Sequence, residues 1–107
     1  DLIYTQNWAT LGLQHAAILF GDDRYAAAAR KSLDLLARIQ DAGTSLRFHG
    51  CWRGMYDMQK GEWGGGDHYE GGAGSVYTGW TNAPIAMAFL FSASGENLFA
   101  ESPLTRL

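Results

Sequence analysis

The feature that most restricts how this chain can fold is the stretch from Gly61 to Ser75, GEWGGGDHYEGGAGS, in which seven residues are glycine. Glycine loses much conformational entropy on folding, so such a density is unsuited to the interior of a helix or strand. Between the glycines stand two large rings, an imidazole and two carboxylates: Trp63, Tyr69, His68, Asp67 and Glu70. A flexible linker is one interpretation, but linkers are poor in large rings. The alternative is a loop folded over a pocket, because long ordered loops are often functional.

Composition limits the classes of protein to which the chain can belong. At 107 residues, with 47% hydrophobic and 18% charged residues, it has the size and composition of one globular domain with a small core. A net charge of −3 with scattered Lys and Arg offers no basic surface, so nucleic acid is not expected as a partner.

Cys51 is the single cysteine, which excludes an intrachain disulfide and argues against a multi-cysteine zinc site. We therefore expect no cofactor. No apolar run approaches the roughly 20 residues of a membrane span, so a membrane is not expected as a partner. The chain begins with Asp1 and shows no signal-peptide pattern, so it is either processed or part of a longer polypeptide. The compartment is left open.

The first forty residues predict an antiparallel helical hairpin over residues 5–40. Apolar residues at spacings of three and four predict one buried face of a first helix: Ile3, Tyr4, Trp8, Leu11, His15, Ile18 and Leu19. Gly21 ends that helix, and Asp22 or Asp23 can cap the next one. The alanine run and a row of apolar residues predict a second helix, closed by Gly43. A short link makes the two helices antiparallel.

The remaining chain predicts a glycine- and aromatic-rich loop over residues 43–80, a buried helix over residues 82–92 and an irregular tail over residues 93–107. Short strands are weakly indicated between Ser45 and Trp52. Asn82 is suited to cap the third helix and Pro84 to its first turn, where no backbone hydrogen bond is donated. This helix is apolar nearly all round, which is typical of a buried helix.

One hairpin and one further helix are too few elements to bury the predicted core, so we expect neighbouring helices that are missing from the chain. The hairpin is followed by HGCWRGMYD (49–57), KGEWGGGDHYEGGAGS (60–75) and VYTGWTNAPIAMAFL (76–90). This order resembles the C-terminal hairpins of α/α-toroid enzymes, the six-hairpin glycosidase-like group. The resemblance implies an all-α chain that is part of a toroid. A whole toroid needs about twelve helices, and this chain supplies about three, so it implies packing against helices of the same polypeptide or of an oligomer partner.

Glycoside hydrolysis needs two carboxyl groups on either side of the scissile bond, one as acid and one as base or nucleophile. Four carboxylates lie within fourteen residues of the predicted loop: Asp57, Glu62, Asp67 and Glu70. Asp67 and Glu70 are the predicted catalytic pair, because the same glycine-bounded stretch presents them beside His68 and Tyr69. Solvation is the ordinary state of loop carboxylates, and it remains the alternative.

Saccharide sites combine flat aromatic platforms with a few fixed polar groups. The predicted substrate-binding residues are Trp52, Arg53, Trp63, His68 and Tyr69, and Trp80 is weighed as a further platform. Core packing is the competing interpretation for each tryptophan. Arg53 suits a hydroxyl or a uronate carboxylate, or a structural salt link with Asp57.

Two alternatives to a glycoside hydrolase follow from the same residues. A polysaccharide lyase would use His68 or Tyr69 as base and Arg53 to neutralise a uronate. A non-catalytic binding or assembly module would dock its apolar helix, Pro84 to Phe91, onto another chain. The pair of His49 and Cys51 matches neither a complete zinc site nor an oriented thiol nucleophile, and His15 suits a hydrogen-bonded core position. An oligosaccharide or polysaccharide is the expected substrate.

Overall fold

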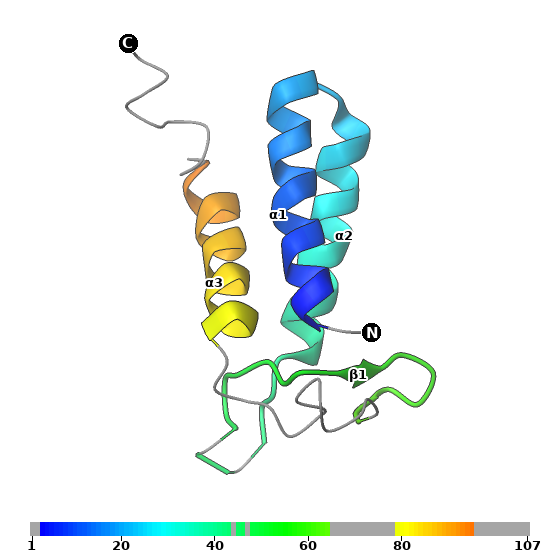
Figure 1. The fold of residues 1–107 in the computed structure, drawn as a ribbon, viewed down its shortest axis with the longest axis vertical. Coiled ribbons are helices and arrows are strands. Elements are labelled where there is room, and N and C mark those ends of the chain that lie inside the picture. The colour runs from blue at the N-terminus through cyan, green and yellow to red at the C-terminus, as the bar shows by residue number, and fades with distance from the viewer. Residues whose placement is uncertain (1–2, 44, 47, 65–78, 96–107) are drawn as a thin grey trace.

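The computed structural model of the 107-residue chain describes residues 3–43, 45–46, 48–64 and 79–95. Three helices and one short hairpin make up the described part: α1 (Ile3–Phe20), α2 (Asp23–Ile39), β1 (Tyr56–Asp57), β2 (Glu62–Trp63) and α3 (Gly79–Ser94). Figure 1 shows the three helices side by side, with the hairpin and its flanking loops at one end. The chain is therefore mostly helical, as the sequence predicts, with two antiparallel strands in addition.

The predicted αα hairpin is confirmed, and so are the residues that turn the chain between its helices. Gly21 has a φ of 60°, a left-handed conformation that ends α1 and that glycine adopts without strain. Asp22 is the N-cap of α2 and accepts a hydrogen bond from the backbone N–H of Arg24 at 2.9 Å. The predicted second helix, over residues 24–40, agrees with α2 to within one residue at each end. The predicted role of Gly43 in closing it is wrong, because Gln40 is already the C-cap and has an extended ψ of 132°.

The strands lie further along the chain than the weak prediction between Ser45 and Trp52. Tyr56 pairs with Trp63 and Asp57 with Glu62 in an antiparallel register. The Asp57 side chain fixes the turn, because its Oδ1 accepts from the backbone N–H groups of residues 59 and 60 at 2.9 and 3.0 Å. Those hydrogen bonds lower the pKa of Asp57 below its usual range, the one from Lys60 being the largest cause. The Asp57 carboxylate is thus engaged in hydrogen bonds within the turn.

Helix α3 starts three residues before the predicted cap and contains Pro84 in its interior rather than its first turn. Asn82 is not a cap. Its side-chain amide binds the backbone of Trp52 in both directions, accepting from the N–H at 2.9 Å and donating to the carbonyl at 3.0 Å. This pair ties the loop after α2 to the first turns of α3.

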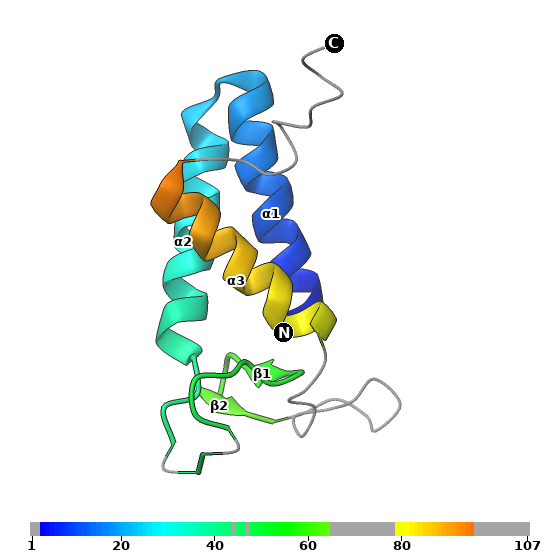
Figure 2. The ribbon, with the colours of Figure 1, turned by 90° about the vertical axis from the view of Figure 1, so that its left-hand side faces the viewer.

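One face of α3 is buried against the hairpin while the other is exposed. Thr81, Ile85 and Ala88 are almost completely buried, whereas Leu90 is 65% exposed. Figure 2 shows α3 crossing over both helices of the hairpin. The core joins the helices and the loops: Ile3, Leu36, Ile39, Trp52 and Ile85. Full burial of such a side chain stabilises the fold by roughly 1.5–3 kcal/mol.

Helix α1 contradicts the prediction about its buried face. Of the seven predicted residues only Ile3 is in the core, and the residues that follow it on the buried face are polar: Asn7, Thr10 and Gln14. Their side chains bind neighbouring helices: Asn7 donates to the Thr81 carbonyl at 2.8 Å and Gln14 to the Ala88 carbonyl at 2.9 Å. The Thr10 hydroxyl shares a hydrogen bond with that of Ser32 on α2.

The other six predicted residues of α1 form what we call the apolar stripe: Tyr4, Trp8, Leu11, His15, Ile18 and Leu19. Tyr4, Trp8 and Ile18 are each about half exposed and Leu19 is 69% exposed, while Leu11 and His15 are partly buried. The spacing of three and four was read correctly as one helix face, but this face points away from the core. Hydrogen bonds to α2 and α3 explain the difference, because they hold the polar face of α1 inward.

No helix in the described part of the chain is both long enough and apolar enough to cross a bilayer.

Candidate functional site

The described loop residues between α2 and α3 lie at one end of the helices, where α3 begins (Figure 2). We call the described part of these loops, residues 41–43, 45–46 and 48–64, the loop layer. It is joined to α1 by the backbone N–H of Ile3, which donates to the Gly54 carbonyl at 3.1 Å. The loop layer thus contacts the start of α1, the end of α2 and, through Asn82, the start of α3.

An ion pair joins Asp41, the first residue of the loop layer, to Arg53. Arg53 donates from Nε to Asp41 Oδ2 at 2.8 Å and from Nη2 to the same oxygen. The Asp41 side chain is 7% exposed and that of Arg53 is 26% exposed, so this is a partly buried pair. Sequence analysis allowed a salt link between Arg53 and Asp57, and the structure places Asp41 there instead.

Asp41 also organises the turn that follows α2. Its Oδ1 accepts from the backbone N–H of Gly43 at 2.8 Å, and its backbone exchanges hydrogen bonds with residues 50 and 51. The Gly43 hydrogen bond, followed by that from Arg53, lowers the pKa of Asp41 below its usual range. A methyl group at Gly43 would meet Asp41 Oδ1 at 2.9 Å, so glycine is what allows this approach.

The Arg53 guanidinium is held from a second side by an aromatic ring. Its Cζ lies 4.3 Å from the centroid of the Phe48 ring, within the range of a cation–π contact. Nearby, His49 Nδ1 lies 3.0 Å from the Gly43 carbonyl. Arg53 is therefore a positioned cation at the surface of the loop layer, with part of its side chain still accessible.

Trp52 lies in the core rather than on the surface. It is 8% exposed, its indole N–H donates to the Leu36 carbonyl at 2.7 Å, and its ring stacks on Phe89 with centroids 6.0 Å apart. This is the core packing that competed with a platform role in the sequence interpretation. In this position Trp52 fixes the backbone beside Arg53 rather than presenting a ring face to solvent.

Trp63 has a more open position on β2. It is partly buried, and its ring meets Tyr56 edge to face with centroids 5.1 Å apart. Such an aromatic pair is worth about 0.5–1.5 kcal/mol beyond its buried area. Both rings also pack against the core, and we call this pair the Tyr56–Trp63 corner.

The other predicted site residues, Asp67, His68, Tyr69 and Glu70, lie outside the described residues, as does the side chain of Trp80. The structure does place the two ends of the segment that carries them. Gly64 donates its N–H to the Met55 carbonyl at 3.3 Å, and Gly79 is the first residue of α3. Both ends lie at the loop-layer end of the molecule (Figure 2).

The Cys51 thiol is not set up as a nucleophile. Burial, followed by the charge of Asp41, raises its pKa, which keeps the thiol protonated. Within the described ranges no three His, Cys, Asp or Glu side chains come together as metal ligands.

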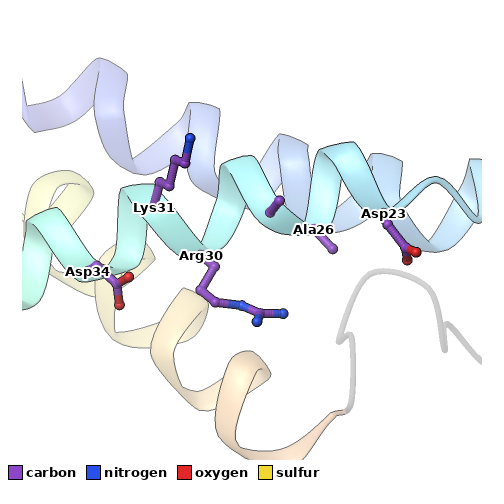
Figure 3. Close-up of a pocket in the computed structure, with 6 residues that line it drawn as sticks. Asp23, Ala26, Arg30, Lys31 and Asp34 are labelled. Atoms are coloured by element: carbon purple, nitrogen blue, oxygen red, sulfur yellow. The ribbon is translucent and has the colours of Figure 1, made fainter.

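Two hollows lined by described residues lie on the helices. One, of about 390 Å³, lies over an exposed face of α2, with two basic residues between two acidic ones (Figure 3). It is lined by Asp23, Ala26, Ala27, Arg30, Lys31 and Asp34. The second, of about 250 Å³, lies where the three helices meet near Gln14, Arg30 and Phe91. Neither of these two hollows is lined by a residue of the predicted site.

Sequence analysis missed Asp41 and misread Asn82. Asp41 stands two residues before Gly43, and an aspartate followed at that distance by glycine is typical of a side-chain-capped turn. That pattern could have identified the turn, although not the pairing with Arg53. The clamp of Asn82 on Trp52 joins residues thirty positions apart, and nothing in the local sequence indicates it.

Comparisons with protein families, with curated proteins and with solved structures found no match to this chain.

Proposed function

We propose that this chain is a carbohydrate-active unit of the α/α-toroid type whose loop layer forms one wall of a saccharide cleft. The observation that carries the proposal is the gathering of Arg53 and the Tyr56–Trp63 corner at one end of the helices. The segment with Asp67 and Glu70 also begins and ends there. Arg53 and Trp63 are both partly exposed on the loop layer, and a cation together with an aromatic ring is a combination that suits a sugar site.

In this proposal Trp63 provides the platform for the apolar face of a sugar ring, next to Tyr56. Arg53 uses Nε and Nη2 for Asp41, so within the described part its Nη1 is left for a sugar hydroxyl. Trp52 acts as a positioning residue, because its hydrogen bonds to Leu36 and Asn82 fix the backbone that carries Arg53. His68 and Tyr69 supply further polar contacts.

Asp67 and Glu70 are proposed as the acid and base pair of a glycoside hydrolase. One donates a proton to the leaving oxygen, while the other activates water or attacks the anomeric carbon. Asp57 is not proposed, because its carboxylate is occupied in the turn after β1.

The test uses the whole 107-residue chain and a panel of neutral and uronate-rich polysaccharides, with release of reducing ends as the readout. Asp67→Asn and Glu70→Gln should each abolish release, while Glu62→Gln should leave it unchanged. Glu62 is the matched control, because it is an exposed carboxylate on β2 with no proposed role. If no saccharide is bound or cleaved by the unaltered chain, the proposal fails.

Product chemistry separates the hydrolase from the lyase. An unsaturated uronate at the new chain end would identify β-elimination, with His68 or Tyr69 as the base. The hydrolase is favoured here because the charge that a lyase would use on a uronate is already engaged: Arg53 is paired with Asp41.

The non-catalytic alternative also has an observation in its favour, although on a different helix from the predicted one. The face of α3 that was expected to dock onto another chain packs partly within this chain, through Ile85 and Ala88. The large apolar surface left open lies on α1.

A further inference from the structure

The two hollows on the helices adjoin each other, because Ala26 and Arg30 line both of them. We call the hollow of about 250 Å³ the inner hollow and that of about 390 Å³ the outer hollow, and the two together the α2 groove. Figure 3 shows the Arg30 side chain extending from α2 on the side where α3 lies. The α2 groove therefore runs from the contact of the three helices onto the exposed face of α2.

The inner hollow is apolar and has a cation at its edge. Its apolar lining consists of Ala17, Ile18, Ala26, Ala29, Leu33 and Phe91. Ala29 and Leu33 are buried, whereas Ile18 is 49% exposed. Arg30 is exposed and forms no ion pair with another described residue. The groove therefore suits an occupant that brings an apolar side chain to the inner hollow and a carboxylate to Arg30.

The end of α3 brings the chain to this groove. Phe91 and Ser92, in the last turn of the helix, line the inner hollow. Gly95 has a φ of 72°, and its N–H donates to the Phe91 carbonyl at 2.9 Å, which is the left-handed ending of a helix. The chain thus leaves the axis of α3 beside the inner hollow. The residues that follow, 96–101, lie outside the described residues and read ENLFAE, an apolar run between two glutamates.

The spacing of these residues allows them to occupy the groove. Phe99 is four residues beyond Gly95, which an extended chain can span over about 14 Å. Phe91 lies only about 6 Å back from Gly95 along the helix axis. A segment of the same chain is present at an effective concentration in the millimolar range, so a small contact area is sufficient for it. A separate partner has no such advantage.

We propose that residues 96–101 of this chain dock in the α2 groove, with the Phe99 ring in the inner hollow and the Glu101 carboxylate paired with Arg30. In this arrangement the segment passes from the inner hollow over Ala27 in the outer one. It covers apolar side chains that the three helices leave partly exposed, and it holds the end of α3 against the hairpin. Two residues of α2 thus report on the segment: Arg30 through its charge and Ala27 through its accessibility.

The first experiment measures thiol labelling by iodoacetamide in the whole chain with Cys51→Ser. Ala27→Cys is compared with Ala37→Cys, because both alanines are exposed on α2 within the described residues and only Ala27 lines the groove. The thiol at position 27 should react more slowly. Phe99→Ser should accelerate it at least ~10-fold, which corresponds to about 1.4 kcal/mol of docking, and should leave position 37 unchanged.

Leu107→Ser is the control for a change of the same kind outside the docked segment, and it should leave both rates unchanged. Circular dichroism of each variant establishes that the helices remain folded.

The second experiment exchanges the proposed ion pair. Arg30→Glu and Glu101→Arg should each accelerate labelling at position 27, and the two together should restore the slow rate. A negative charge near a thiol by itself slows the reaction, because it disfavours the thiolate. An acceleration in Arg30→Glu therefore reports loss of the covering segment rather than a change in the thiol.

Three results would overturn the proposal. The first is equal labelling at positions 27 and 37 in the otherwise unaltered chain. The second is slow labelling at position 27 that Phe99→Ser and Glu101→Arg leave unchanged. The third is protection of position 27 that disappears on dilution, which would show that a second copy covers the groove. None of these measurements involves a sugar, so the outcome is independent of whether the chain cleaves polysaccharides.

Discussion

The two helices of the hairpin differ in the polarity of the face that they bury. Helix α2 buries an apolar row that contains Ala29, Leu33, Leu36 and Ile39, and it exposes its charged residues. Helix α1 buries Asn7, Thr10 and Gln14 and leaves Tyr4, Trp8 and Leu19 exposed. An amphipathic helix such as α2 buries its apolar face within a single domain and exposes its polar face to water. Helix α1 has polar contacts with this chain on one side and an apolar side that is partly exposed.

The largest expected effect lies on the apolar face of α2. Leu36→Ala should destabilise the chain by about 2–5 kcal/mol, because it leaves a cavity at a completely buried position. Leu90→Ala on the exposed face of α3 is the control, and it should change the free energy of unfolding by less than ~0.5 kcal/mol. Both values come from urea denaturation. Equal effects of the two substitutions would show that Leu36 is not in the core.

The next effect concerns the point where α2 passes into the loop layer. Asp41→Asn should cost about 1–3 kcal/mol at neutral pH, because it weakens the hydrogen bonds from Gly43 and Arg53 to a charged acceptor. Denaturation of the variant beside the unaltered chain measures this difference.

The same residue predicts a pH dependence. The pKa of Asp41 is lowered by folding, so its contribution to stability is fully present above its unfolded value of about 3.9. It is lost as the pH falls through the lower folded value. The stability difference between the unaltered chain and Asp41→Asn should therefore shrink in acid. A difference that grows as the pH falls would contradict the direction of the shift.

A smaller effect of opposite sign is expected on the polar face of α1. Gln14 Oε1 is buried and has no hydrogen-bond partner within the described residues. Gln14→Met keeps the length of the side chain, loses one hydrogen bond to the Ala88 carbonyl and removes that buried oxygen. Because the desolvation of an unpaired group costs more than one hydrogen bond gains, thermal unfolding should show a stabilisation of about 1 kcal/mol. A clear destabilisation would show that the oxygen is satisfied.

The smallest effect on stability is expected on the apolar stripe. Leu19→Ala should change the free energy of unfolding by less than ~0.5 kcal/mol, because the side chain is 69% exposed. Urea denaturation of the variant beside the unaltered chain measures this difference. A large loss would mean that Leu19 supports the fold of the chain.

Local signals in the sequence were sufficient for the hairpin. Gly21 and Asp22 have local effects. Gly21 adopts a left-handed backbone conformation, and Asp22 caps α2 by accepting a hydrogen bond from Arg24, two residues away. Spacing identified the apolar residues of α1 as one face, but it could not say that the face points outward. That outcome depends on hydrogen bonds from Asn7 and Gln14 to residues 74 positions away on α3.

The roles of the predicted site residues stay predictions, and contacts distant in the sequence explain what could not be foreseen about them. Arg53 and Trp63 lie at the same end of the helices, but their partners, Asp41 and Tyr56, were not predicted. Trp52 and Trp63 look alike in the sequence, because each is a tryptophan near glycines. They differ in the contacts that the fold gives them: Trp52 stacks on Phe89, and Trp63 meets Tyr56. The catalytic roles of Asp67 and Glu70 stay predictions, which the polysaccharide assay tests.

The comparison of the two helices depends on the orientation of α1, whose polar face is turned inward. Thiol labelling tests it directly, with Thr10→Cys and Trp8→Cys compared in dilute, folded protein that carries Cys51→Ser. Thr10 is completely buried and Trp8 is about half exposed, so the thiol at position 8 should react rapidly and the one at position 10 only on unfolding. Equal reaction rates, or a faster reaction at position 10, would show that α1 turns its apolar stripe toward the core.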